Sequence, residues 1–312
     1  MAASSVPERA LEVFAELPER FRRSGQPSAW FFGKEAATAH SFLEGPAFDR
    51  AGRLWVVDIP FGRLFRISPD GRDWELAAEY DGEPNGLAIH RDGRVFIADH
   101  RQGLMVLDPG TGRVEPLLPR VRREGFKGLN DLTFARNGDL YFTDQGQTSL
   151  ADPTGRLWRL RAADGKPECL LDNVPSPNGL VLTSDERALL LAVTRANQIW
   201  RVQLHPDGSV GKVGIFVQLS GGLIGPDGLA LDETGGLVVA HAGFGTVWLL
   251  SRLGEPRLRL GSPRGLSVTN VCFGGEGGRS LFVTESDSGS ILRAELDVAG
   301  APLFSHAAAG NP

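Results

Sequence analysis

Gly225-Pro226-Asp227-Gly228-Leu229-Ala230-Leu231-Asp232 decides the fold, because this stretch contains one of six copies of a short pattern. In each copy a turn delivers an oxygen-bearing side chain, and a short apolar strand follows it. Successive copies start 41, 45, 48, 49 and 42 residues apart. The six copies are Glu44–Phe48, Asn85–Ile89, Asn130–Phe134, Asn178–Leu182, Asp227–Leu231 and Thr269–Phe273.

A period of about 40–45 residues is typical of propeller blades or helical solenoids, and the pattern inside the period separates the two. After the first copy come three more strand-like runs, Gly52–Asp58, Gly62–Ile67 and Trp74–Tyr80, bounded by Gly, Asp-Gly and Pro signals. Runs this short cannot be helices of useful length. Four strands in each of six periods predict an all-β, six-bladed β-propeller with four antiparallel strands per blade.

The last blade has no clear fourth strand of its own. The N-terminal run Leu11–Leu17 has the length and spacing to supply it, so we predict that this run closes the sixth blade. Closure by both chain ends would remove an unpaired sheet edge. An amphipathic helix over Glu8–Arg23 is the competing prediction, which Pro18 weakens because proline interrupts a helix.

Composition limits the classes of partner. The net charge of −5 argues against binding to nucleic acid through its phosphates, and no apolar run reaches membrane-spanning length. The first 26 residues carry Glu and Arg throughout, unlike a signal peptide, and two cysteines form no disulfide framework. We therefore expect a cytoplasmic protein without nucleic-acid or membrane partners; the sequence leaves its oligomeric state open. We also expect one domain over 1–312, with the closing strand and a connector in 1–40 and six repeats in 41–300.

The first residues of the innermost strands of a propeller gather at one mouth of its central channel. All six openings carry a side-chain oxygen, and Glu44 and Asp227 carry carboxylates. Oxygens of this kind are the ligands of calcium, whereas zinc sites use His and Cys, which open none of the first five copies. Asn-Gly and Asp-Gly are also common turn residues. Six copies in one register, with Glu44 where a turn would favour Asn, point instead to a cation site.

Five segments resemble the signature of the SMP-30/gluconolactonase/luciferin-regenerating-enzyme family: Glu44-Gly-Pro, Leu129-Asn-Asp131, Ser176-Pro-Asn-Gly179, Gly225-Pro-Asp-Gly228 and Thr269-Asn-Val271. The resemblance runs from about Phe42 to Leu296 in the family's order and spacing. It implies a propeller that holds one divalent cation in its channel and hydrolyses a lactone or related ester. The oxygen ligands favour calcium, while zinc, manganese and magnesium remain alternatives.

The same resemblance implies roles for particular residues. It implies that Glu44, Asn178 and Asp227 are metal ligands, that Asn130 is a ligand or a substrate contact, and that Asp227 is the catalytic acid or base. Further substrate contacts are predicted from the repeat and from the cationic or imidazole groups: Asn85, Asn270, Lys127, Arg101, Arg195 and His241.

Two positions depart from related groups. Sugar-lactone members often carry Arg two residues before the position of Asn130, where this chain has Gly128, so a sugar lactone is not the favoured substrate. Calcium-dependent phosphotriesterases place a His where this chain has Cys272, which disfavours that alternative function. A non-enzymatic metal-binding propeller is the remaining alternative.

The second strands of five blades end in an ionisable residue. Strand ends are generally wet, so we expect these side chains to face solvent at the opposite mouth rather than to support the site. They are Asp58, Asp99, Asp144, His241 and Glu285.

Overall fold

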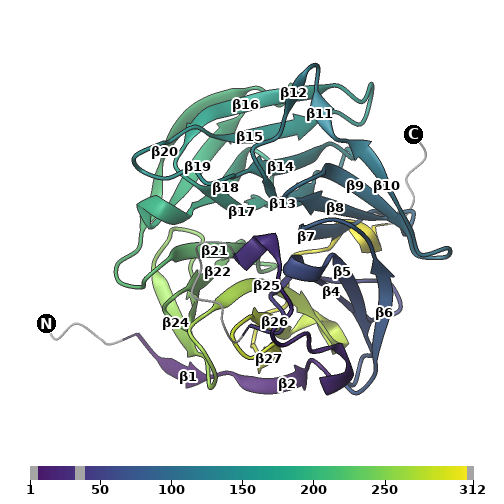
Figure 1. The fold of residues 1–312 in the computed structure, drawn as a ribbon. Coiled ribbons are helices and arrows are strands. Elements are labelled where there is room, and N and C mark those ends of the chain that lie inside the picture. The colour runs from purple at the N-terminus through teal and green to yellow at the C-terminus, as the bar shows by residue number, and fades with distance from the viewer. Residues whose placement is uncertain (1–5, 32–38, 308–312) are drawn as a thin grey trace, which may run out of the picture.

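The computed structural model describes residues 6–31 and 39–307. Six antiparallel sheets surround a central axis as the blades of a propeller (Figure 1). The predicted fold is therefore confirmed. From the channel outwards, blade 1 comprises β3 (Leu43–Phe48), β4 (Leu54–Asp58), β5 (Arg63–Ile67) and β6 (Trp74–Glu79). Blade 2 comprises β7 (Pro84–Ile89), β8 (Val95–Asp99), β9 (Gly103–Asp108) and β10 (Arg113–Leu118). Blade 3 comprises β13 (Leu129–Phe134), β14 (Leu140–Asp144), β15 (Gly155–Leu160) and β16 (Pro167–Val174).

The second half of the ring has the same order. Blade 4 comprises β17 (Pro177–Leu182), β18 (Ala188–Val193), β19 (Gln198–Leu204) and β20 (Val210–Gln218). Blade 5 comprises β21 (Gly225–Leu231), β22 (Leu237–Ala242), β23 (Thr246–Leu250) and β24 (Pro256–Gly261). Blade 6 comprises β25 (Val268–Gly274), β26 (Ser280–Glu285), β27 (Ser290–Glu295) and β2 (Glu12–Glu16).

Short elements decorate the blades. A small hairpin, β11 (Arg120–Val121) and β12 (Glu124–Gly125), leads into blade 3. Six 3-10 helices lie in the described segments, and none of the described helices is long and apolar enough to cross a membrane. They are η1 (Glu19–Phe21), η2 (Ala29–Phe31), η3 (Ile59–Phe61), η4 (Thr194–Ala196), η5 (Glu276–Gly278) and η6 (Phe304–His306).

The N-terminal segment closes the ring, as predicted. Strand β2 pairs antiparallel with β27, the last strand of the repeats, so the sixth blade is built from both ends of the chain. Strand β1 (Glu8–Ala10) then adds a fifth, parallel strand to the outer edge of blade 5, which the sequence did not predict. The competing helix over Glu8–Arg23 is wrong. That residues 1–312 form one domain stays a prediction.

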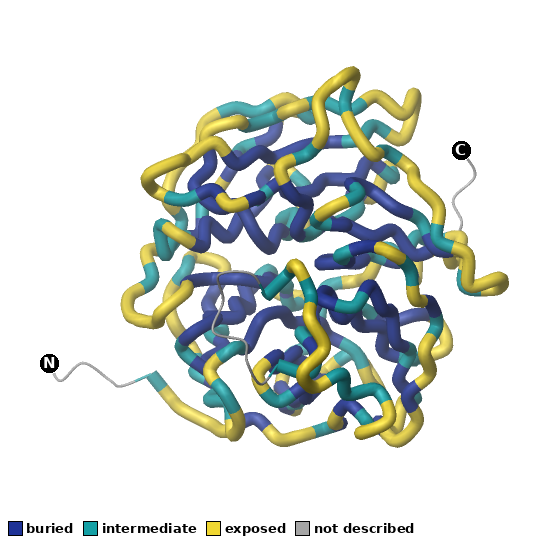
Figure 2. The backbone as a smooth tube through the Cα atoms, viewed as in Figure 1, coloured by how far each residue is buried: buried dark blue, intermediate teal, exposed yellow. Residues whose placement is uncertain are grey.

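The core lies between the blades. The second strands, such as β22, are buried along their whole length, whereas the fourth strands and the turns are exposed (Figure 2). Because both faces of the inner strands pack against neighbouring blades, these strands read as continuous apolar runs.

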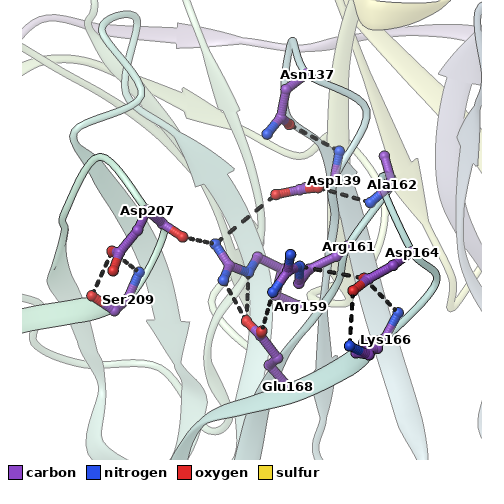
Figure 3. Close-up of polar contacts among 10 residues, drawn as sticks. All are labelled: Asn137, Asp139, Arg159, Arg161, Ala162, Asp164, Lys166, Glu168, Asp207 and Ser209. Carbon is purple, nitrogen blue, oxygen red and sulfur yellow. Dashed lines mark hydrogen bonds and ion pairs between the residues drawn. The ribbon is translucent and has the colours of Figure 1, made fainter.

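Polar contacts add to this apolar packing at the outer part of the ring. Arg159 on β15 donates to Glu168 of β16 (Nε to Oε2, 3.0 Å) and to the carbonyl of Asp207 (2.8 Å), which belongs to the β19–β20 turn of blade 4 (Figure 3). Arg159 therefore joins blade 3 to blade 4 and has a structural role away from the channel.

Candidate active site in the central channel

Every innermost strand loses its regular pairing at the same place. In blades 3, 4 and 5 the pairing skips from Leu129 to Leu132, from Pro177 to Leu180 and from Pro226 to Leu229. The other three blades have a corresponding irregularity. A break of this kind frees side chains from the ladder and redirects them. It coincides with the residue that opens each repeat, so the repeat becomes a ring of polar groups at one mouth.

Glycine at the following position lets the inner strands approach one another closely. A Cβ added at Gly179 would lie 2.4 Å from the carbonyl oxygen of Asp227, and one added at Gly86 would lie 2.7 Å from Oδ1 of Asp131. Neither position has room for a larger residue. The oxygen-bearing side chains of successive blades are thus brought together by backbone contact between their strands.

Three carboxylates share the channel: Glu44, Asp131 and Asp227. Burial raises the pKa of Glu44 to about 8 and that of Asp131 to about 7, and it raises the pKa of Asp227 well above its usual value. Repulsion from the other two carboxylates adds to the shift at Asp227, and Asp131 adds to that at Glu44. Among the described residues, neither Glu44 nor Asp227 has an ion pair. The channel therefore holds three carboxyl groups whose ionisation is disfavoured unless positive charge is supplied, and no described residue forms an ion pair with Glu44 or Asp227.

Asp131 was not among the predicted site residues. Four of the six repeats have glycine at its position, directly after the opening residue, and the other two have Asp131 and Asn270. The replacement of glycine by a polar residue at this position was the feature of the sequence that could have identified Asp131. The backbone N–H of Leu132 donates to Oδ1 of Asp131 (2.8 Å), which fixes the carboxylate beside the channel.

Asn270 orients Glu44. Its Nδ2 donates to Oε2 of Glu44 (2.9 Å), while its Oδ1 accepts from the N–H of Val271 (2.8 Å). The same Oε2 accepts from the N–H of Gly45 (2.6 Å). Both polar atoms of the Asn270 side chain are thus occupied, and its predicted substrate contact stays a prediction.

Asn178 presents a buried oxygen to the same region. Its Oδ1 has no hydrogen-bond partner among the described residues, and its side chain lowers the pKa of Asp227 against the larger effect of burial. An unpaired buried acceptor costs free energy unless something satisfies it. Together with the unpaired carboxylates of Glu44 and Asp227, it forms the hard oxygen donor set that calcium and magnesium prefer.

The predicted ligands therefore fit a divalent cation by their chemistry. No three side chains of His, Cys, Asp or Glu form a metal cluster within 6–31 and 39–307, so the fit depends on amide oxygens as well as carboxylates. Glu44, Asn178 and Asp227 supply such a mixed set.

Asn130 is held by a chain of side chains that the sequence did not reveal. Its Nδ2 donates to Oε1 of Gln145 (3.0 Å), and Nε2 of Gln145 donates to Oγ of Ser176 (3.0 Å). This orientation leaves Oδ1 of Asn130 without a partner among the described residues. Asn85 is buried and makes no side-chain hydrogen bond with another described residue. Their predicted contacts with a metal or substrate stay predictions.

The basic and imidazole residues that were predicted to contact substrate have different surroundings. Lys127 is exposed and donates through Nζ to Thr154 (2.9 Å), and Arg101 pairs with Asp81. His241 is fully buried; burial lowers its pKa to about 4, so the imidazole is neutral. Its Nδ1 accepts from Trp248 (3.2 Å), and its Nε2 faces the segment around Gly222. The predicted substrate contacts of Lys127, Arg101 and His241 stay predictions.

The expectation that the second-strand ends face solvent at the opposite mouth is wrong. Because the second strand of each blade runs antiparallel to the first, its end lies at the same mouth as the site. The side chains there are fully buried and support the mouth loops; Asp144, for example, accepts from the N–H groups of Lys127 and Gly128. The residues concerned are Asp58, Asp99, Asp144, His241 and Glu285.

Cys272 is a core residue. It packs in the apolar cluster that contains Phe48 and Phe282, and burial raises the pKa of its thiol far above the ordinary value. A thiol that stays protonated is a poor nucleophile. Cys272 therefore takes no part in the chemistry of the channel.

Comparison with known proteins places this geometry in context. The pattern of the SMP-30/Gluconolactonase/LRE-like region matches residues 42–287. The Lactonase drp35 of Staphylococcus aureus (strain MRSA252) is 27% identical over 228 residues, which cover 69% of this chain and 68% of that protein.

Solved structures share the fold. A putative gluconolactonase superposes with a TM-score of 0.74 at 22% identity, over 94% of this chain and all of that chain (100%). A calcium-binding protein, regucalcin from Agrobacterium tumefaciens, superposes with a TM-score of 0.74 at 23% identity, over 97% of this chain and 99% of its own.

Proposed function

Because the chain belongs to the SMP-30/gluconolactonase/LRE-like family, we propose that it is a divalent-cation-dependent hydrolase that opens a lactone or a related ester. The observation that carries the proposal is the oxygen-rich channel, in which Glu44, Asp227 and the unpaired Oδ1 of Asn178 lie together and no described residue forms an ion pair with either carboxyl group. The likeness to a lactonase supports the reaction class.

Glu44, Asn178 and Asp227 would hold the cation, with Asn130 as a further ligand or a substrate contact. The absence of His and Cys from this set favours calcium among the divalent ions. When bound, such a cation supplies a Lewis acid that polarises a carbonyl group and makes a water molecule more acidic.

The side chains of the channel handle the proton. Hydrolysis joins the oxygen of water to the carbonyl carbon and breaks the bond from that carbon to the ring oxygen, so one proton leaves the water and one reaches the departing oxygen. Asp227 accepts the first and returns it to the second, giving a hydroxy acid. A cation beside Asp227 lowers its pKa and makes it a weaker base, which the repulsion from Glu44 and Asp131 opposes. Asn85 and Asn130 orient the substrate from the adjacent blades.

A lactone panel tests the proposal. Hydrolysis would be measured after a chelator has removed bound metal and again after calcium, magnesium, manganese or zinc has been restored. We expect activity to disappear on chelation and to return with calcium. A folded protein that binds the cation and hydrolyses no lactone or ester would instead be a metal-binding propeller without this activity, and hydrolysis of a phosphotriester alone would identify a different reaction.

A further inference from the structure

Exposed apolar side chains lie on the rim of the channel mouth. Leu223, Ile224 and Leu266 keep 81%, 40% and 52% of their surface exposed, and we call these three residues the apolar shelf. They lie in the segments that lead into β21 and β25, which carry Asp227 and Asn270. Exposed apolar side chains that gather at one place mark interaction sites more often than scattered ones do.

Backbone hydrogen bonds hold the apolar shelf in place around the β22–β23 turn. The N–H of Leu223 donates to the carbonyl of Gly243 (3.1 Å), and the N–H groups of Gly243 and Gly245 donate to the carbonyl of Leu266 (2.9 and 3.0 Å). A Cβ at Gly243 would lie 2.9 Å from Cγ1 of Ile224, and one at Gly245 would lie 3.1 Å from Cδ2 of Leu266. The shelf is therefore one surface shared by blades 5 and 6.

Arg195 lies on the same rim, in the short helix η4 that follows the second strand of blade 4. Its neighbour Thr194 donates through Oγ1 to the carbonyl of Pro226 (2.8 Å), next to Asp227. Asn197, at the end of the same turn, donates to the carbonyl of Gly221 (2.9 Å) in the segment that carries the shelf. The exposed guanidinium of Arg195 is close enough to Asp227 for its charge to lower the pKa of that carboxyl.

The second strand of blade 4 offers Arg195 no carboxylate at its end. In blades 1 and 3 an arginine near the mouth pairs with the carboxylate that ends the second strand: Arg63 with Asp58, and Arg156 with Asp144. In blade 4 the equivalent pair is Val193 and Gln198, so this second strand ends without a carboxylate. Among the described residues Arg195 makes no hydrogen bond or ion pair, so its guanidinium is available to a ligand.

We propose that the substrate is a lactone that carries an apolar substituent and a hydrogen-bond acceptor beside the ring. The apolar shelf holds the substituent, and Arg195 holds the acceptor. The proposal rests on the proposed function, since it places the reacting ring at Asp227. A sugar lactone would put hydroxyl groups against Leu223, Ile224 and Leu266, whose side chains offer them no hydrogen-bonding group.

The shelf suits a substituent better than a protein. Only two residues separate Ile224 from Asp227 in the chain, so the shelf is continuous with the proposed reaction site. Three side chains also fall far short of the roughly 800 Å² per partner that a stable interface between proteins buries.

A chain-length series tests the shelf. The full chain with calcium would be given five-membered lactones with unbranched alkyl groups of one to seven carbons, and kcat/KM would be measured for each. We expect kcat/KM to rise by up to about fourfold per added methylene until the shelf is covered. The double variant Leu223→Ser/Ile224→Ser flattens this dependence. Leu253→Ser changes another exposed leucine (68%), which lies in the β23–β24 turn at the far end of the blade, and this variant should keep the chain-length dependence.

A second comparison tests Arg195. At fixed chain length, a substituent with a carbonyl oxygen next to the ring would be compared with a plain alkyl substituent. We expect wild type to prefer the carbonyl compound, Arg195→Gln to lose the preference, and Arg195→Lys to retain part of it. Equal preference in wild type and Arg195→Gln would remove Arg195 from the binding site.

These experiments distinguish failure of the substrate inference from failure of the proposed function. Cation-dependent hydrolysis of short lactones with no chain-length dependence would overturn the inference and leave the proposed function standing. No hydrolysis of any lactone would overturn both. A dimer in solution that Leu223→Ser/Ile224→Ser converts to a monomer would assign the shelf to a second copy of the chain and overturn the substrate proposal.

Discussion

Asp227 has two properties that seldom occur together in one carboxyl group. It is buried next to two other carboxylates, which favours its protonated form, and it lies beside Asn178, whose unpaired oxygen suits a cation that would favour the ionised form. The free energy needed to ionise it in the channel is therefore returned when a cation binds. This exchange makes Asp227 the residue whose replacement is most informative.

We expect Asp227→Asn to reduce kcat by at least ~10²-fold, because it removes both a ligand and the proton acceptor. The variant should remain folded, and in the presence of a chelator its melting temperature should equal or exceed that of wild type, since one source of repulsion is gone. Steady-state kinetics and thermal unfolding check this. Asp172→Asn, which changes an exposed carboxylate on β16, is the matched control and should behave like wild type. Normal turnover by Asp227→Asn would end its assignment.

At the scale of elements, the close approach of β17 and β21 depends on Gly179. A methyl group there would meet the backbone of Asp227 and Gly228 at 2.4 and 2.7 Å, so the two strands would have to separate. We expect Gly179→Ala to cost about 1–3 kcal/mol of unfolding free energy and to weaken cation binding. Calorimetric titration with calcium and urea unfolding measure the two effects.

Gly214→Ala is the control for that variant. Gly214 lies on β20 with no heavy atom within 4 Å of an added Cβ, and its backbone is in a conformation open to any residue. Its substitution should leave both quantities unchanged. If Gly179→Ala is equally silent, the contact between β17 and β21 does not position the site.

The closing strand makes a second prediction at this scale. Leu17, which follows β2, is buried in the cluster shared by blades 1 and 6 and keeps 1% of its surface exposed. We expect Leu17→Ala to lower the unfolding free energy by about 2–5 kcal/mol, because it leaves a cavity where the ring closes. Val13→Ala, on the exposed side of β2, should cost far less. Similar losses from both would show that closure does not depend on this packing.

For the whole molecule, the channel carboxylates link stability to pH. The folded-state pKa values of Glu44 and Asp131 are raised to about 8 and about 7, so their contribution to stability is fully present below about pH 4 and is lost as pH rises through 7 to 8. In a chelator, the melting temperature should therefore fall between pH 6 and pH 8.5.

Calcium should reverse that trend. Its ligands must be deprotonated, so the stabilisation it gives grows as pH rises. Melting curves with chelator and with calcium across this range test the linkage. Glu44→Gln should flatten the dependence measured in the chelator. A metal-free melting temperature that rises steadily to pH 8.5 would contradict it.

Short segments of the sequence predict much of this architecture. Six copies of one pattern, each an oxygen-bearing residue at a turn followed by an apolar strand, determine the number of blades and place polar groups at one register. These signals are local, because turn chemistry and strand alternation depend on residues a few positions apart. The prediction that Leu11–Leu17 closes the ring followed from the same count, since one strand was missing.

Contacts between blades decided the rest. That Asp131 shares the channel, that Asp144 and its counterparts are buried, and that Arg195 has no partner are properties of pairs of residues far apart in the chain. The antiparallel return of each second strand brings its end to the mouth, and the neighbouring blade determines whether that end is buried. Sequence alone determined the six-bladed fold and the register of its polar groups. Only the tertiary structure decided which charges face one another, because burial and pairing depend on neighbours in space.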